Sequence, residues 1–185
     1  MTEYLPGIYF LTGSTFLHFP YFRDEEQKEI IYNQIKKIKK ELGIKICAFS
    51  IQINHYHILF ETNNVRDVEM IKKYIHGGVS RIYRQKYRMK YKEMWGSMKT
   101  IKVFSLEMYW KIIGYIAGNL LKHKEVGTFE ELFLDSFSCY SHFVGKYGEE
   151  MMREIIYSVL ITDEDENGLV DAEEMKKVRL GRVPN

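Results

Sequence analysis

The sequence predicts an α+β fold in which one antiparallel sheet carries its helices on one face. Two kinds of segment support this prediction. Stretches rich in β-branched and aromatic residues alternate with stretches whose apolar residues recur at helical spacing. Their order is β-α-β-β-α-β, followed by further helix. This is the split β-α-β order of the ferredoxin-like (RRM-like) arrangement.

The first half of the chain supplies a strand, a helix and a pair of strands. Residues 8–19 are rich in β-branched and aromatic types and predict the first strand. Asp24 can cap a helix that Gly43 ends, and isoleucines recur between them at helical spacing. Residues 44–53 and 54–61 predict two further strands.

The second half completes the pattern. Residues 65–91 predict a helix that is interrupted or kinked at Gly77-Gly78. Residues 100–104 predict a short strand. Ser105 can cap a last helix over residues 106–123.

Length and composition indicate one domain, or one domain with a small appendage. The chain has 185 residues, of which 45% are apolar, so it can build a core. Cys47 and Cys139 make neither a disulfide framework nor a zinc pattern, which favours a reducing cytoplasm. No leader and no membrane span are expected, because no apolar run is long enough.

The charges are unevenly distributed, although the net charge is only +2. The segment 72–102 is basic and interleaved with tyrosines and Trp95, whereas the segment 149–174 is acidic. Cations neutralise phosphates and aromatic rings stack on unpaired bases, so the basic segment is a candidate nucleic-acid surface. An ordinary solvated helix face explains it equally well. The candidate DNA-binding residues are Lys72, Lys73, Arg81, Arg84, Lys86, Arg88 and Lys99.

A pair of histidines lies in the third predicted strand. Alternate strand residues share a face, so His55 and His57 point to one side of the sheet while Tyr56 points to the other. Two adjacent imidazoles make half of a site for a divalent metal. Taken alone, a His-x-His pair is more often a surface or hydrogen-bonding feature.

The last helix carries a second candidate pair. Tyr115 and Asn119 are four residues apart and therefore stack on one helix face. An amide oxygen suits magnesium or manganese and could complete a two-histidine site. Taken alone, a tyrosine at position 115 is more often a half-buried core residue. Gly114 and Gly118 weaken this helix, and either close DNA approach or close helix–sheet packing would explain them.

Together the two pairs resemble a known family. Asn54-His55-Tyr56-His57 looks like the HUH motif, in which a bulky residue separates two histidines. Residues 115–119 resemble the tyrosine helix of the REP-associated tyrosine transposases, which belong to the single-tyrosine transposases of the insertion-sequence 200/605 type. Similarity extends from about residue 4 to residue 147, so residues 1–147 are assigned to an HUH-type catalytic domain.

The resemblance implies a chemistry. Tyr115 would be the nucleophile, and His55, His57 and Asn119 would hold Mg²⁺ or Mn²⁺. The enzyme would cleave and rejoin single-stranded, hairpin-containing DNA through a 5′-phosphotyrosine intermediate. The resemblance also implies a cytoplasmic, nucleoid-associated homodimer, in which the tyrosine helix sometimes serves the partner's histidines.

The chain also departs from this family. The family often carries an arginine- and asparagine-rich stretch after the first strand, and residues 13–18 stand there instead. Leu120 replaces a proline after the asparagine, and residues 96–99 lack an arginine that often follows the tryptophan. These departures concern DNA sequence preference more than the chemistry, since the metal and tyrosine positions are kept.

Residues 148–185 are predicted to form an acidic helical extension. A twelve-residue stretch within it resembles an EF-hand calcium loop in every ligand position. EF-hands normally come in pairs, so an acidic, solvated helix–turn–helix is the competing interpretation. The candidate Ca²⁺ ligands are Asp163, Asp165, Asn167, Asp171 and Glu174.

Two other functions compete with the nuclease. A non-catalytic module that binds single-stranded nucleic acid would suit the basic segment but would not require the histidine pair, Tyr115 and Asn119 together. It predicts binding that needs no metal and leaves no covalent adduct. A calcium-binding interaction protein would suit the tail but would leave the first 145 residues unexplained.

Overall fold

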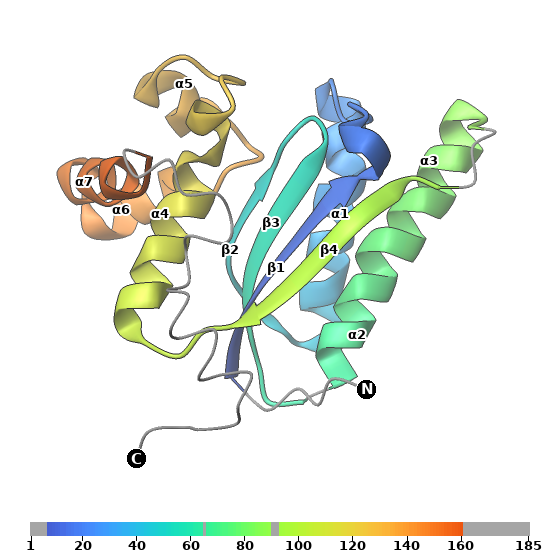
Figure 1. The fold of residues 1–185 in the computed structure, drawn as a ribbon, viewed down its shortest axis with the longest axis horizontal. Coiled ribbons are helices and arrows are strands. Elements are labelled where there is room, and N and C mark those ends of the chain that lie inside the picture. Colours follow the sequence, from blue (N-terminus) through green and yellow to red (C-terminus); the bar gives the residue numbers. More distant parts are fainter. Residues whose placement is uncertain (1–6, 65, 90–92, 161–185) are drawn as a thin grey trace.

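The computed structural model describes residues 7–64, 66–89 and 93–160. At its centre is one antiparallel sheet of four strands in the order β2-β3-β1-β4 (Figure 1). Each strand pairs antiparallel with its neighbours. The strands are β1 (Gly7–Thr15), β2 (Lys45–Ile51), β3 (His55–Thr62) and β4 (Trp95–Lys102). The α+β, ferredoxin-like fold predicted from the sequence is confirmed.

One face of the sheet is covered by the helices that connect the strands. As predicted, α1 begins after Asp24, whose side chain accepts a hydrogen bond from the backbone of Gln27, and it ends at Gly43. Alternate strand residues such as Tyr9 and Leu11 pack with these helices in a first core. The helices on this face are α1 (Glu25–Leu42), α2 (Arg66–Lys72), the π-helical η2 (Lys73–Gly78) and α3 (Val79–Tyr87).

The opposite face is also covered, by the helices that follow the last strand. Phe10 and Leu59, which alternate with first-core residues along their strands, pack in a second core with the apolar side of α4. The arrangement with helices on one face therefore holds for the β-α-β-β-α-β core, and the later helices add a third layer (Figure 1). They are α4 (Leu106–Lys122), α5 (Phe129–Leu134), α6 (Tyr140–Tyr147) and α7 (Glu149–Leu160).

The largest differences from the predicted element boundaries occur at three places. β1 ends at Thr15, and residues 16–18 form the short 3-10 helix η1 (Phe16–His18) rather than more strand. β4 begins at Trp95 instead of residue 100. The sequence did not predict its first half as a strand, because those residues form an exposed sheet edge without alternation of apolar and polar residues. The helix expected over residues 65–91 ends at Tyr87, where Arg88 adopts a positive φ of 49°.

Helix α7 belongs to the second core. It packs along α4, and the two α4 glycines permit the contact. A Cβ on Gly114 would lie 2.7 Å from Ile155 Cγ2, and one on Gly118 would lie 2.6 Å from Ile156 Cγ2. These glycines therefore face a helix, and neither the sheet nor DNA. Within the described chain, the expected division at residue 147 does not separate two cores. The candidate calcium loop lies outside the described residues.

None of the helices within the described residues is long and apolar enough to cross a membrane.

Candidate active site

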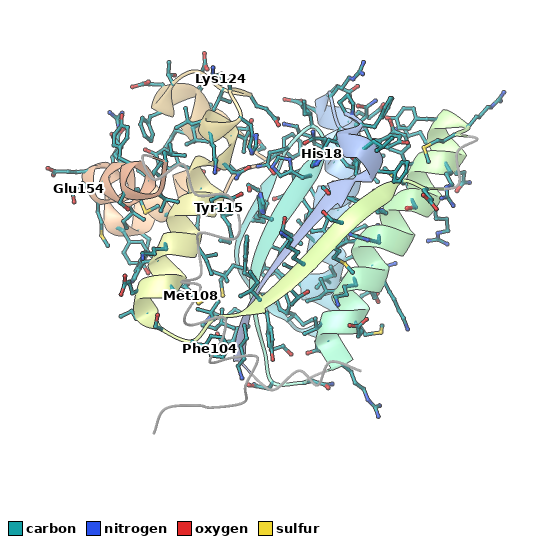
Figure 2. All side chains as sticks on the ribbon, viewed as in Figure 1. His18, Phe104, Met108, Tyr115, Lys124 and Glu154 are labelled. Atoms are coloured by element: carbon teal, nitrogen blue, oxygen red, sulfur yellow. The ribbon has the colours of Figure 1, made fainter. Side chains whose placement is uncertain are left out.

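Strand β3 and helix α4 bring the four predicted site residues together between the sheet and its third layer. His55 and His57 pair across the sheet with Ser14 and Thr12, so both imidazoles point toward α4. Tyr115 and Asn119 lie on the face of α4 that meets them. All four side chains are buried: His55 is 9% exposed, Tyr115 4%, and His57 and Asn119 are fully covered. Figure 2 labels Tyr115 between α4 and the strands.

The contacts within this group are direct. Asn119 Oδ1 lies 3.1 Å from His55 Nε2. The His57 ring packs edge-on against the Tyr115 ring, with centroids 5.1 Å apart, and lies 5.1 Å from the His55 ring. Phe10 stacks on His57 from the sheet side. The tyrosine therefore stands next to one imidazole and the asparagine next to the other.

Both imidazoles are held in the neutral form. Burial, and after it the nearby His123, lowers the pKa of His55 from its usual 6.5 to about 4. Burial and the neighbouring His55 hold the pKa of His57 well below 6.5. A neutral imidazole has a lone pair to offer, which is the form that binds a metal ion.

The tautomer of His55 follows from its neighbours. Asn54 donates its amide N–H to the His18 carbonyl at 3.2 Å, so its Oδ1 accepts from His55 Nδ1–H at 2.6 Å. The lone pair of His55 then resides on Nε2 and faces Asn119 Oδ1. A cation between Nε2 and the amide oxygen could bind to both atoms. Asn54 thus orients the imidazole of His55. Metal-binding histidines are commonly oriented in this way by a hydrogen bond from a neighbouring residue that does not itself bind the metal.

Unsatisfied polar atoms in the same place fit a metal ion. Among the described residues, neither ring nitrogen of His57 nor Asn119 Nδ2 has a hydrogen-bond partner, although all are buried. The same part of the chain holds no cluster of three or more His, Cys, Asp or Glu suited to a metal. A site here would consist of His55, His57 and the Asn119 amide oxygen.

The sequence reasoning missed two residues near this group. His123 caps the C-terminal end of the helix that bears Tyr115, and its ring centroid is 4.6 Å from that of His55. Lys122 places its ammonium 5.0 Å from the centroid of the Tyr115 ring. Helical periodicity could have indicated His123, because positions 115, 119 and 123 are spaced four residues apart.

The family model described as "Transposase IS200 like" matches residues 18–115, which is more than half of the chain. The chain belongs to the IS200-like transposase family. This match begins in η1 and ends at Tyr115, so Asn119 lies beyond it.

Two solved structures are similar to this IS200-like transposase. One is a REP-associated tyrosine transposase bound to a REP hairpin: it is 16% identical, with a TM-score of 0.63, covering 79% of this chain and 84% of that one. The other is a "putative transposase" from Deinococcus radiodurans R1: it is 16% identical, with a TM-score of 0.46, covering 63% of this chain and 92% of that one. At this identity the first likeness supports the fold. No curated protein matches the chain.

The predicted DNA-binding residues of the transposase fall on two faces. Lys99 pairs with Thr12, which also pairs with His57, so Lys99 is on the active-site face of the sheet. The other six lie on α2, η2 and α3 or directly after them, on the opposite face. Lys72 pairs with Glu69 and Lys86 with Glu26, so these two also have structural roles.

A pocket of about 570 Å³ opens on that opposite face of the transposase. Arg81 and Arg84 line it together with His76 and Trp95, whose rings are stacked 4.3 Å apart. The Trp95 indole N–H also donates to the His76 carbonyl in the π-helix. Two of the predicted basic residues therefore share one concave surface with an aromatic ring.

A buried ion pair ties the two halves of the active site together. Lys28 Nζ lies 2.7 Å from Glu125 Oε2, and each side chain is 10% exposed. Glu125 Oε1 also accepts a hydrogen bond from the backbone N–H of Ile53 at 2.8 Å. Glu125 follows α4 and Ile53 precedes the histidine strand, so this carboxylate joins the element that bears Tyr115 to the element that bears His55.

Proposed function

We propose that this IS200-like transposase cleaves and rejoins single-stranded DNA through a covalent bond between Tyr115 and a 5′-phosphate. The observation that supports this best is the packing of Tyr115 beside two neutral imidazoles, one of which faces the Asn119 amide oxygen. A structural tyrosine alone would not require those buried groups with unsatisfied atoms.

Tyr115 is the nucleophile in this proposal. Its phenol oxygen attacks phosphorus, the bond from phosphorus to the 3′ oxygen breaks, and a free 3′-hydroxyl leaves. The phenol proton is lost as the leaving oxygen gains one, so no net proton or redox partner is needed. In the reverse step another 3′-hydroxyl attacks the phosphotyrosine, the bond from phosphorus to the Tyr115 oxygen breaks, and the phenol regains its proton. A phosphodiester is thereby restored without ATP.

His55, His57 and Asn119 would hold the divalent metal, which is Mg²⁺ or Mn²⁺ in this proposal. When bound, the metal polarises the scissile phosphate and stabilises the charge that develops on its oxygens. The chain's own contribution is orientation. Asn54 fixes the imidazole of His55 so that Nε2 faces the site, and Phe10 holds the ring of His57 from the other side.

The substrate in this proposal is single-stranded or hairpin DNA. The REP-associated transposase with a similar fold is bound to a REP hairpin. Lys99 on the active-site face and Lys122 beside Tyr115 are placed to meet the phosphates of a strand that reaches the nucleophile. Arg81 and Arg84 would meet a more distant part of the DNA on the opposite face. All four site residues come together within one chain, so the site geometry does not itself call for a second copy. A homodimer therefore stays a prediction of the family resemblance.

The test is a covalent-adduct assay. Labelled hairpin DNA from the flanks of the gene is incubated with the protein and Mn²⁺ or Mg²⁺, then resolved on a denaturing gel. We expect a protein–DNA band that disappears with EDTA and in Tyr115→Phe. Tyr109→Phe is the matched control, because it removes the same hydroxyl from another tyrosine of the same helix. An adduct that persists in Tyr115→Phe would contradict the proposal.

The non-catalytic module makes a different prediction in the same assay. It would bind the hairpin in EDTA as well as in Mn²⁺ and give no covalent band with any flanking sequence. The calcium-binding alternative concerns residues outside the described structure and is tested separately by calorimetric titration of the full chain with Ca²⁺.

A further inference from the structure

The turn after β1 presents large apolar side chains to solvent. Phe16 is 41% exposed, Leu17 82% and Phe19 51%. Apolar side chains of this size are normally scattered singly on a protein surface, whereas here three stand within four residues. We call residues 16–19 the apolar turn.

The apolar turn is held rigidly in a strained conformation. Leu17 and His18 both have a φ of 53°, in the left-handed region that residues other than glycine seldom adopt. Hydrogen bonds hold the backbone there: Thr15 Oγ1 donates to the Phe19 carbonyl at 2.7 Å, and Phe16 N–H donates to the Met94 carbonyl at 2.9 Å. Strained residues that the surrounding structure maintains cluster at functional sites.

This turn adjoins the candidate active site. The His18 carbonyl accepts from Asn54, which in turn accepts from His55, so two hydrogen bonds connect the turn to the metal-site imidazole. The backbone N–H of Thr15 also donates to the Asn54 carbonyl at 2.8 Å. Figure 2 labels His18 at the end of β1 and Tyr115 on α4. The apolar turn therefore lies two hydrogen bonds away from the imidazole that the scissile phosphate would approach.

We propose that Phe16, Leu17 and Phe19 form a stacking platform for unpaired nucleobases next to the scissile phosphate. The inference rests on the proposed function, since single-stranded DNA supplies the unpaired bases. Phenylalanine rings present π faces, and every base has one, so stacking is strong and tolerant of sequence. Arg23, whose guanidinium lies 6.0 Å from the Phe19 ring centroid, adds a positive charge for the backbone of the same strand. The platform would thus contribute affinity rather than base identity.

The test measures binding without cleavage. Fluorescence anisotropy in EDTA, with Tyr115→Phe as the parent, compares a short oligothymidylate with an abasic oligomer of the same length. We expect Phe16→Ala and Phe19→Ala each to weaken oligothymidylate binding by about 5- to 150-fold, the range that corresponds to one lost base–aromatic stack. Binding of the abasic oligomer should change by less than about twofold, because it has no base to stack.

Three controls separate stacking from folding. Leu17→Gly removes an exposed side chain and suits the positive φ, so the thermal midpoint should stay equal or rise while affinity falls. Leu134→Ala changes a side chain that is 80% exposed on α5 and should leave binding unchanged. Phe16→Trp should restore the affinity that Phe16→Ala loses, because it keeps an aromatic face.

The outcomes are distinct. Equal effects of the phenylalanine variants on both oligomers, or no binding of oligothymidylate, would overturn the platform. Stacking-dependent binding without any covalent adduct in the active protein would overturn the proposed nuclease and leave the platform standing. If the phenylalanine variants bind DNA and form the covalent adduct as well as the parent proteins do, the platform is overturned and the proposed nuclease stands.

Discussion

The buried Lys28–Glu125 pair offers a quantitative test of how the active site is held together. Lys28→Met leaves the Glu125 carboxylate, 10% exposed, without its cation. Breaking a buried ion pair in this way costs about 3–5 kcal/mol of folding stability. The double variant Lys28→Met/Glu125→Gln leaves no buried charge, and its amide oxygen can still accept from Ile53 N–H. It should therefore recover most of the loss.

An exposed pair with the same geometry is the control. Lys45 Nζ lies 2.7 Å from Glu61 Oε2, the same separation, but those side chains are 72% and 43% exposed. Lys45→Met should cost far less folding stability than Lys28→Met, because solvent already screens the exposed pair. Each coupling energy comes from urea unfolding of the unmodified protein, the two single variants and the double variant of that pair. The remaining variants needed are Glu125→Gln, Glu61→Gln and Lys45→Met/Glu61→Gln. If Lys28→Met costs no more than Lys45→Met, the Lys28–Glu125 ion pair is not buried as described.

Three further predictions concern separate parts of the molecule. Gly118→Ala should lower stability by about 1–3 kcal/mol in urea unfolding, because its Cβ would clash with Ile156, whereas alanine usually stabilises a helix glycine. Burial lowers the pKa of His76 to about 4. Between pH 4 and 6.5 the unfolded protein therefore binds more protons than the folded protein does. The free energy of unfolding should fall by up to about 3 kcal/mol as the pH drops through that window, and it should fall less steeply in His76→Gln. His123→Ala should raise the pKa of His55 in an NMR titration, since His123 lowers it now; an unchanged pKa would contradict that account.

The sequence was sufficient for the part of the site that depends on local geometry. Strand alternation placed His55 and His57 on one face, and helical spacing placed Tyr115 with Asn119, without any knowledge of how the two elements pack. The structure then brings these two pairs into contact. Their roles in metal binding and cleavage stay proposals.

Other features depended on long-range packing and could not be predicted. The polar first half of β4 forms a strand because β1 pairs with it, not because of its own residues. The need for glycine at positions 114 and 118 becomes clear only from the packing of α7 against α4, which leaves no room for a Cβ there. The His18–Asn54–His55 chain joins residues 36 and one apart in sequence, so no periodic pattern contains it.

The packing of α7 on α4 also bears on how far this enzyme could be shortened. The family match stops at Tyr115, in the middle of α4 and well before the helix that backs it. A protein trimmed to the matched region would lose Asn119 and expose the apolar side chains that Met152, Ile156 and Val159 now cover. The smallest autonomous unit therefore extends to about residue 160, and engineering that grafts or fuses the domain should cut after α7.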